Sequence, residues 1–297
     1  MKNTKLKNIS LAATAACLLA LPAVQAADWN GDGDGFSWED GDNWGDNAEP
    51  TAGSLARFNA VSGSSDVYIT QAGELADRFI IGQGGTIHKL TIESGGSLTT
   101  DSGTVSRIGQ TSEGWLTMNG GTLTIGVGGY SSDAGGRLII NDGDVNLGGN
   151  SSVGTSATNQ TGFLEINGST ATIDVAGAYT FGSFSTTIFT LDSALAGVSA
   201  VNNTGDLNLD ALSTLTVDFR GYDFSANKGS DIVLFDYGTL GGGGADTFGT
   251  INFIGGFGEL DYTTGGQIRL LSVVPEPSST ALLGLGLSSL LLRRKRS

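Results

Sequence analysis

Four segments in the middle of the chain repeat one pattern of apolar and polar positions. They begin at Leu90, Leu116, Leu138 and Leu164, which are nearly evenly spaced along the chain. Each segment places apolar residues two positions apart and ends in Asn, Asp or Gly. A period of two predicts half-buried β-strands that end in turns. The pattern therefore predicts short strands that recur at a nearly constant interval.

Further short strands flank these segments. One often follows, as at 97–99 and 122–125, and another precedes the next repeat, as at 80–83 and 107–110. Three short strands with Gly-rich corners, repeated at this interval, predict the coils of a right-handed parallel β-helix. The four leucines would then stack as one buried column. An antiparallel β-sandwich, whose hairpins also give short strands and regular turns, stays open as the alternative.

The N-terminal segment 1–26 has the three parts of a secretory signal peptide. Three lysines lie at positions 2, 5 and 7, and the apolar stretch at 9–21 is too short to span a bilayer, which takes about 20 residues. Small residues at 24 and 26 predict that signal peptidase cuts between Ala26 and Ala27. The single cysteine, Cys17, lies in this segment, so we expect no disulfide in the mature protein.

The other end of the chain combines three unlike features in a fixed order. Pro275, Glu276 and Pro277 come first, and 278–292 carries no charge. A helix over this uncharged stretch covers about 22 Å at 1.5 Å per residue, against about 30 Å of hydrocarbon in a bilayer. The basic cluster that follows, which the positive-inside rule keeps in the cytoplasm, consists of Arg293, Arg294, Lys295 and Arg296.

This order of features resembles the PEP-CTERM sorting signal, and the resemblance covers 274–297. The resemblance implies recognition and processing by an exosortase, a membrane enzyme, with membrane contact through the C-terminal helix before processing. It also implies export to the cell surface or the extracellular matrix, because such proteins commonly accompany exopolysaccharide systems. A simple tail anchor is the alternative.

Aromatic residues gather near the start of the mature chain. Trp38, Trp44, Pro50 and Phe58 resemble the motif that opens many autotransporter-like and PEP-CTERM β-helical passengers. The resemblance implies that the tryptophans cover the open end of the first coil.

The predicted fold class is all-β: a right-handed parallel β-helix with an irregular β C-terminal cap, an N-terminal signal helix and a C-terminal hydrophobic helix. The segments expected in chain order are the signal peptide at 1–26, a Trp-rich N-terminal cap at 27–66, the repeats at 67–186, terminal coils or an antiparallel cap at 187–273, and the sorting signal at 274–297.

The charge of the chain limits its partners. Residues 27–277 hold eight basic and 30 acidic residues, a formal charge of −22. Proteins bind nucleic acid phosphates with Lys and Arg, so a body this acidic is not expected to bind nucleic acid. The same charge favours solubility and attracts divalent cations.

One acidic segment fits a metal-binding pattern. Asp28, Asn30, Asp32 and Glu39, with Gly33 at the sixth position, match the calcium loop D-x-[DN]-x-[DN]-G-x5-E. The segment starts directly after the predicted cleavage site, which leaves no room for the entering helix of such a loop. An acidic turn in the N-terminal cap is the alternative, and we expect no other cofactor.

An enzyme needs a cluster of reactive groups that the sequence does not show. His88 is the only histidine and is expected at an exposed corner. Glu93, Asn119, Asp142 and Asn167 fall at equivalent positions of four repeats, but only two are acids and no basic residue recurs beside them. We interpret these four residues as turn residues. They match neither the paired carboxylates of a polysaccharide hydrolase nor the acid and base of a lyase.

An ice-binding solenoid needs an unbroken column of threonines. The column that contains Thr91 and Thr117 would continue as Ile139 and Glu165, and the column of Thr99 and Thr124 would reach Asn146. Broken columns make ice binding the weaker alternative. The sequence therefore favours a secreted, non-catalytic surface or matrix protein, structural or adhesive, with extracellular polysaccharide as its partner, ahead of a polysaccharide lyase or hydrolase.

Overall fold

The computed structural model describes residues 25–59, 66–154, 161–192, 201–227, 231–241 and 246–276. One short 3-10 helix, Gly41–Asn43, is the only helix in these ranges, and every other element is a strand. No helix in this part of the chain is long and apolar enough to cross a membrane. The predicted signal helix and C-terminal hydrophobic helix lie outside the described residues, except that residues 25 and 26 belong to a strand.

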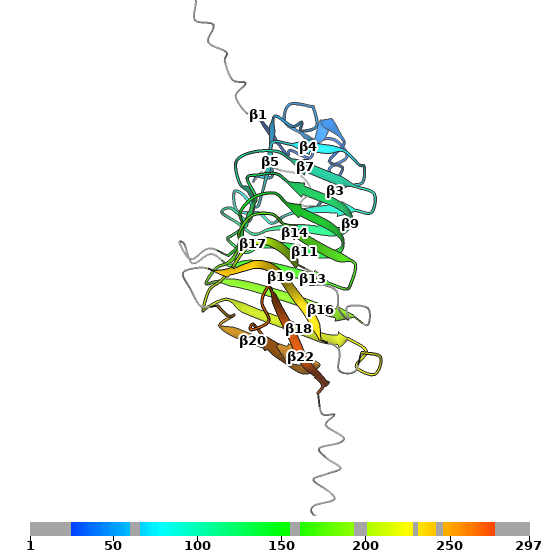
Figure 1. Cartoon of the computed structure of the whole chain (residues 1–297). Coiled ribbons are helices and arrows are strands. Elements are labelled where there is room, and N and C mark those ends of the chain that lie inside the picture. The colour runs from blue at the N-terminus through cyan, green and yellow to red at the C-terminus, as the bar shows by residue number, and fades with distance from the viewer. Residues whose placement is uncertain are drawn as a thin grey trace, which may run out of the picture.

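The strands form a parallel β-solenoid of about seven turns with three sheets, which we call faces A, B and C (Figure 1). Face A contains β3 (Asp66–Ile69), β6 (His88–Glu93), the first halves of β9 (Gly114–Ile125) and β11 (Gly136–Leu147), β13 (Gly162–Asn167), β16 (Ser185–Asp192), β18 (Thr214–Gly221) and β20 (Thr250–Ile254).

Face B contains β4 (Glu74–Ala76), β7 (Ser97–Thr100), the second halves of β9 and β11, β14 (Ala171–Val175) and parts of β17 (Val201–Leu209) and β19 (Ile232–Gly241). Face C contains β1 (Gln25–Asp28), β2 (Ser54–Arg57), β5 (Arg78–Ile81), β8 (Ser106–Ile108), β10 (Tyr130–Ser132), β12 (Ser151–Val153), β15 (Tyr179–Phe181) and the remaining parts of β17 and β19.

The stacking of the coils follows the leucine repeat. Leu90 pairs with Leu116, Leu116 with Leu138, and Leu138 with Leu164, all in parallel register, and none is more than 1% exposed. The predicted column and the parallel solenoid are therefore confirmed, and the antiparallel sandwich is excluded. The handedness of the coils stays a prediction.

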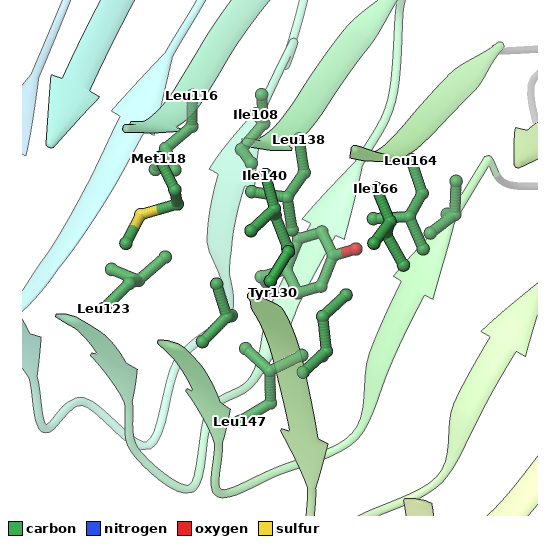
Figure 2. Close-up of a cluster of buried hydrophobic side chains, with 14 of the residues drawn as sticks. Ile108, Leu116, Met118, Leu123, Tyr130, Leu138, Ile140, Leu147, Leu164 and Ile166 are labelled. Carbon is green, nitrogen blue, oxygen red and sulfur yellow. The ribbon is translucent and has the colours of Figure 1, made fainter. Parts of the chain in front are cut away.

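A second buried column lies beside the leucines and explains why the coils need one another. Figure 2 shows Met118, Ile140 and Ile166 pointing into the same interior as the leucines. Burying one such side chain contributes about 1.5–3 kcal/mol, and a single coil has no interior in which to bury it. Each coil is thus stable only when stacked on its neighbours.

Glycines at the corners allow the coils to approach closely. Gly109 has φ of 75°, in the left-handed region, and a Cβ at this position would lie 2.0 Å from the backbone oxygen of Asp133 in the next coil. Any other residue would force the two coils apart at this corner. The Gly-rich composition therefore reflects corner geometry and not disorder.

The prediction that His88 is exposed is wrong. His88 is 3% exposed, because it precedes Leu90 and Ile92 by two and four positions and shares their inward direction. Its Nε2 lies 2.8 Å from the hydroxyl of Thr86, and its ring packs against Phe58. Burial lowers its pKa. This histidine is part of the packing under the first coils.

The N-terminal end of the solenoid is closed by aromatic side chains. Trp29, Trp38, Trp44 and Phe58 are at most 1% exposed and meet one another in mostly edge-to-face contacts. Trp44 also donates from Nε1 to the backbone oxygen of Trp38 at 2.9 Å. The covering role that the resemblance implied for the tryptophans agrees with this arrangement.

The C-terminal end contains both kinds of structure that the sequence left open. Parallel coils continue through β16, β17, β18 and β19 to β20. Antiparallel pairs then follow, in which β22 (Gln267–Pro275) lies between β21 (Gly256–Asp261) and β19. The described chain thus begins and ends at opposite ends of the solenoid (Figure 1).

Candidate functional site

A groove of about 380 Å³ crosses four successive coils where face B turns toward face C. A volume of this size is within the range of ligand sites in proteins. Its lining consists of Thr124, Ile125, Gly126, Asn146, Leu147, Gly148, Asp174, Val175, Ala176, Asn202 and Thr204. Three successive coils each contribute the same three positions, at the end of the strand and the start of the corner, and the fourth coil contributes Asn202 and Thr204 of β17.

One wall of the groove is a column of polar side chains. Thr124 pairs with Asn146, Asn146 with Asp174, and Asp174 with Asn202, so the four lie on adjacent strands. Adjacent strands are about 4.8 Å apart, which gives the column a regular spacing along the solenoid axis. Each side chain faces outward because it alternates with buried residues of face B.

Two members of the column bond each other and two do not. Asn202 donates from Nδ2 to Oδ1 of Asp174 at 2.8 Å. The side chains of Thr124 and Asn146 have no hydrogen-bond partner within the described ranges. A hydroxyl and a whole amide group are therefore available to a ligand, beside a carboxylate with one oxygen still uncommitted.

The floor of the groove is mostly apolar. It is formed by Gly126 and Gly148, which have no side chain, and by Ala176, whose side chain is a single methyl group. The backbone N–H groups of Gly126 and Ala176 point along the solenoid to the preceding coil, where they donate to the oxygens of Thr100 and Leu147, both at 2.8 Å. What faces the groove is therefore mainly carbon surface beneath a row of hydrogen-bonding groups.

The electrostatics of the groove exclude one class of ligand. Asp174 is the single charged residue of the lining, and no lysine or arginine takes part. A polyanion would meet a carboxylate in a body that is already strongly acidic. Hydroxyl-rich neutral molecules, which accept from amides and donate to carboxylates, match these groups better.

Three side chains of the predicted calcium loop, those of Asp28, Asn30 and Glu39, accept hydrogen bonds from three different residues. Asp28 accepts from the guanidinium of Arg57 in a bidentate pair, at 2.5 and 2.7 Å. Asn30 accepts from the N–H of Asp32 at 3.1 Å, whereas Glu39 accepts from the N–H of Thr70 at 2.7 Å. No group of three or more acids or histidines that could hold a metal occurs in the described part of the chain. Calcium binding stays a prediction, and at Asp28 it would have to displace Arg57.

Another acid in this segment has a structural task. Asp34 accepts from the N–H groups of Phe36 and Ser37, at 2.9 and 2.8 Å, and from Nδ2 of Asn43 at 2.7 Å. Burial favours a higher pKa, but these three donors outweigh it and hold the pKa of Asp34 below its usual value. The carboxylate thereby fixes the turn that carries Trp38 into the aromatic cluster.

The corner residues considered for catalysis form a ladder of side-chain amides. Asn119 donates to Glu93 at 3.2 Å, Asn141 to Asn119 at 2.9 Å, and Asn167 to Asn141 at 2.8 Å. Asn141, and not Asp142, therefore occupies this place in the third repeat. The backbone of Asp142 pairs with Asn119, and Asn141 is the extra residue at a register shift between Ile140 and Asp142, from which its side chain reaches Asn119.

The threonine columns are broken at the predicted places. Thr117 follows Thr91 and is followed by Ile139 and then Glu165. On face B, Thr99 and Thr124 are followed by Asn146, the first amide of the groove column. The column that fails as an ice-binding surface is thus the wall of the groove.

The predicted sorting residues begin where the last strand ends. Pro275 lies opposite Gly256 in the antiparallel pair of β21 and β22, and the N–H of Glu276 donates to the oxygen of Gly255 at 3.5 Å. The side chain of Glu276 is exposed. The remaining predicted residues of this signal, from Pro277 to Arg296, lie outside the described residues.

A family model described as the PEP-CTERM protein-sorting motif matches residues 273–296. The chain carries a PEP-CTERM sorting motif. The motif marks an exported protein that is directed to the cell surface and recognised by an exosortase, a membrane processing enzyme. The match starts within β22, so the PEP-CTERM motif leaves directly from the folded body. No curated protein and no solved structure matches this chain.

At the opposite end from the PEP-CTERM motif, the predicted signal cleavage site lies in a strand. Ala26 pairs with Leu55 and Ala27 with Ala56, and Ala27 is buried. A protease needs an extended, accessible substrate. Cleavage between Ala26 and Ala27 stays a prediction, and it would have to precede the pairing of β1 with β2.

Sequence reasoning missed Asp174 and Asn202 as members of a common surface. A signal was present, because the column of Thr99, Thr124 and Asn146 was recognised and only its continuation was not. The later coils, which carry Asn146 to Asp174 and Asp174 to Asn202, are longer than the repeat that the leucines define on face A. The leucine spacing therefore does not predict this continuation.

Proposed function

We propose that the exported solenoid is a non-catalytic surface or matrix protein that binds a neutral extracellular polysaccharide in the groove of face B. The observation that carries the proposal is the column of Thr124, Asn146, Asp174 and Asn202, which repeats hydrogen-bonding groups along the solenoid axis. A linear polymer of sugars also repeats its hydroxyl groups along one axis. A polysaccharide that lies along the column can therefore make several weak contacts at once, and their free energies add up.

The chemistry of the lining supports a sugar ligand. Amide, hydroxyl and carboxylate groups form the wall, and Gly126, Gly148 and Ala176 leave a mostly apolar surface beneath it. Sugar rings present hydroxyls at their edges and C–H groups on their faces. A ring that lies on this floor can direct its hydroxyls to Asn146 and Asp174 at the same time.

The same groove supports binding ahead of hydrolysis. Glycoside hydrolases use two carboxyl groups, and the lining contributes only Asp174. The carboxyl group with a strongly raised pKa, Glu74, lies on β4, two coils away from Thr124 along face B. A binding role requires neither a second acid nor a proton donor at the groove.

Binding is tested with the exported protein that is recovered after the full chain has been expressed and processed. A neutral glucan and a galactomannan are compared with alginate, an acidic polysaccharide, by affinity electrophoresis and calorimetry. We expect binding to a neutral polymer and none to alginate. Ala176→Trp should fill the floor of the groove and weaken binding by about tenfold or more, equivalent to about 1.4 kcal/mol. Ala52→Trp, at an exposed position near the N-terminal end, is the matched control and should leave binding unchanged.

Three outcomes would overturn the proposal. One is binding that Ala176→Trp leaves intact, which would place the ligand elsewhere. Another is preferential binding of alginate over neutral polymers. The third is release of reducing or unsaturated sugar ends, which would establish a hydrolase or lyase.

A further inference from the structure

The last parallel strand of face A has a partner on one side only within the described strands. β20 pairs with β18, from Thr214 opposite Thr250 to Asp218 opposite Ile254. Its other edge presents backbone N–H and C=O groups with no strand beside them in the described part of the chain. Such an edge is a template for the addition of another strand.

Apolar side chains surround this edge. Ile251 and Ile254 are 39% and 40% exposed, whereas Leu215, which precedes Ile251 in the same inward column, is fully buried. No further coil of the described structure covers the column of Leu215 and Ile251 beyond β20. Phe257 and Val274, which face each other in β21 and β22, are about half exposed and belong to the same end.

The segment that contains β20 carries no charge and, unlike other uncharged stretches such as 116–132 and 175–191, it lies at an end of the solenoid. Residues 247–258 contain no charged side chain, in a chain with a net charge of −15. Two copies of so acidic a protein repel each other wherever their charged surfaces meet. A neutral, β-prone strand without proline is where two copies can approach.

We propose that two copies of the processed chain associate through antiparallel pairing of β20 with β20 of the second copy. A register centred on Asn252 places Ile251 opposite Phe253 of the second copy. Ile251 and Phe253 both continue inward columns, since they pair with Leu215 and Val217. This register therefore joins the interiors of the two solenoids, and a register shifted by one residue would place polar side chains against it.

The pairing closes on itself and does not form a filament. The contact is the same surface on both copies, which gives a two-fold dimer. On face A, the N-terminal end offers no equivalent edge among the described residues, because the segment that holds Ser37 bridges to Tyr68 of β3. The first strands of faces C and B, β1 and β4, each pair with one described strand only. One short strand with a few apolar side chains makes an interface below the standard size of about 1,600 Å², so we expect a Kd in roughly the micromolar range.

The place of the sorting motif links this dimer to processing. The motif begins at residue 273, in β22, beside the exposed edge. Before processing, the C-terminal segment that the sequence predicts to contact the membrane would hold this end of the solenoid toward it. Removal of that segment frees the same end for a second copy.

Sedimentation velocity of the exported, processed protein tests the proposal between about 1 and 100 μM. We expect a concentration-dependent dimer, weakened at least tenfold by Ile254→Lys, because a lysine on an edge strand opposes pairing. Val127→Lys makes the same charge change at a 71% exposed site on the side of the solenoid, and should dimerise like the native chain. The melting temperatures of both variants show whether they fold.

Hydrogen exchange supplies a second measurement and distinguishes this proposal from the glycan site. The amides of β20 should gain protection as the protein concentration rises, with no polysaccharide present. Ala176→Trp, which fills the groove, should leave the dimer intact, so either proposal can fail alone. A monomer at all concentrations, or a dimer that Ile254→Lys leaves unchanged, would overturn the inference. Capture of the monomer by phosphatidylcholine vesicles, abolished by Ile254→Lys, would overturn it too by identifying the membrane as the occupant.

Discussion

The two ends of the solenoid terminate the same stack of coils in different ways. At the N-terminal end, Trp38 and Trp44 are fully buried and the chain itself bridges to the first strands. At the C-terminal end, Ile251 and Phe257 are exposed and β20 has one free edge among the described strands. The aromatic cluster replaces a missing coil at the first end. At the second end, β21, β22 and the side chain of Phe224 cover only part of the last coil.

The difference in covering between the two ends agrees with what lies beyond each end in the chain. The predicted start of the mature chain is a free terminus in the exported protein, so any exposed core there has to be covered by the protein itself. The other end continues into the PEP-CTERM motif and hence toward a membrane enzyme. The membrane contact predicted for the C-terminal helix before processing would allow this end to remain apolar without exposing that surface to water.

The sorting motif gives the largest expected effect at the open end. Glu276→Ala should leave unprocessed precursor in the membrane fraction of a host with an exosortase. Glu276 is exposed and its N–H, which Ala retains, makes the bond to Gly255, so the fold should not change. Immunoblotting of cell fractions measures precursor against released protein. Processing as complete as that of the native chain would contradict recognition through this residue, and Phe257→Ala is the control that leaves the motif intact.

A variant in the middle of the solenoid shows how large a loss of stability the disruption of a fully stacked column causes. Leu138→Asp places a charge in the fully stacked column, and we expect a loss of more than about 4 kcal/mol in the free energy of unfolding. Leu212→Asp, at a 66% exposed position, should change it by less than about 0.5 kcal/mol. Denaturant titrations of the two variants compare these values. Similar losses for both would be incompatible with the leucine column.

Aromatic truncation compares the ends directly. Trp44→Ala should cost about 3–5 kcal/mol, because it opens a cavity in the buried cluster and removes contacts to Trp29, Trp38 and Phe58. Phe257→Ala, at an exposed position of the other end, should cost less than about 1 kcal/mol in the monomer. Equal costs, measured by denaturation at low protein concentration, would remove the distinction between a closed and an open end.

A carboxyl group at the closed end predicts a smaller, pH-dependent effect. Burial, followed by the charges of Glu49 and Glu39, raises the pKa of Glu74 from 4.5 to about 7. Between these values the unfolded chain has released a proton that the folded chain retains, so stability should fall as pH rises from about 4.5 to 7 and then level off.

The Glu74→Gln variant isolates this contribution. The difference in melting temperature between the variant and the native chain should grow over that interval of pH, in favour of the variant. A pH-independent difference would show that Glu74 titrates normally. Glu259→Gln, at the open end, leaves Glu74 in place and serves as the control.

The sequence predicts the stacking better than it predicts the ends and the groove. Leu90, Leu116, Leu138 and Leu164 identify the register because a period of two and a nearly constant coil length act together. His88 differs from its predicted place at an exposed corner because β6 begins at this residue, two positions before Leu90. The same spacing would have placed it inside.

Other features depend on contacts that no local pattern encodes. Asp28 fits a calcium loop in sequence, yet Arg57, far along the chain on β2, occupies its carboxylate. Asp174 joins Asn146 only through a coil that is longer than the repeat of face A. Asn141 takes the place of Asp142 in the amide ladder because it is the extra residue at a register shift, which the sequence repeat does not predict.

Hydrogen exchange of the exported protein, followed by mass spectrometry at a concentration where it is monomeric, tests the contrast between the ends most directly. We expect peptides from 25–58 to exchange almost as slowly as those of β9 and β11, and peptides from 250–261 to exchange fastest among the strands, because free edges and uncovered columns open locally. Slow exchange at 250–261, or fast exchange around Trp38 and Trp44, would contradict a solenoid that is closed at its start and open where the sorting motif leaves it.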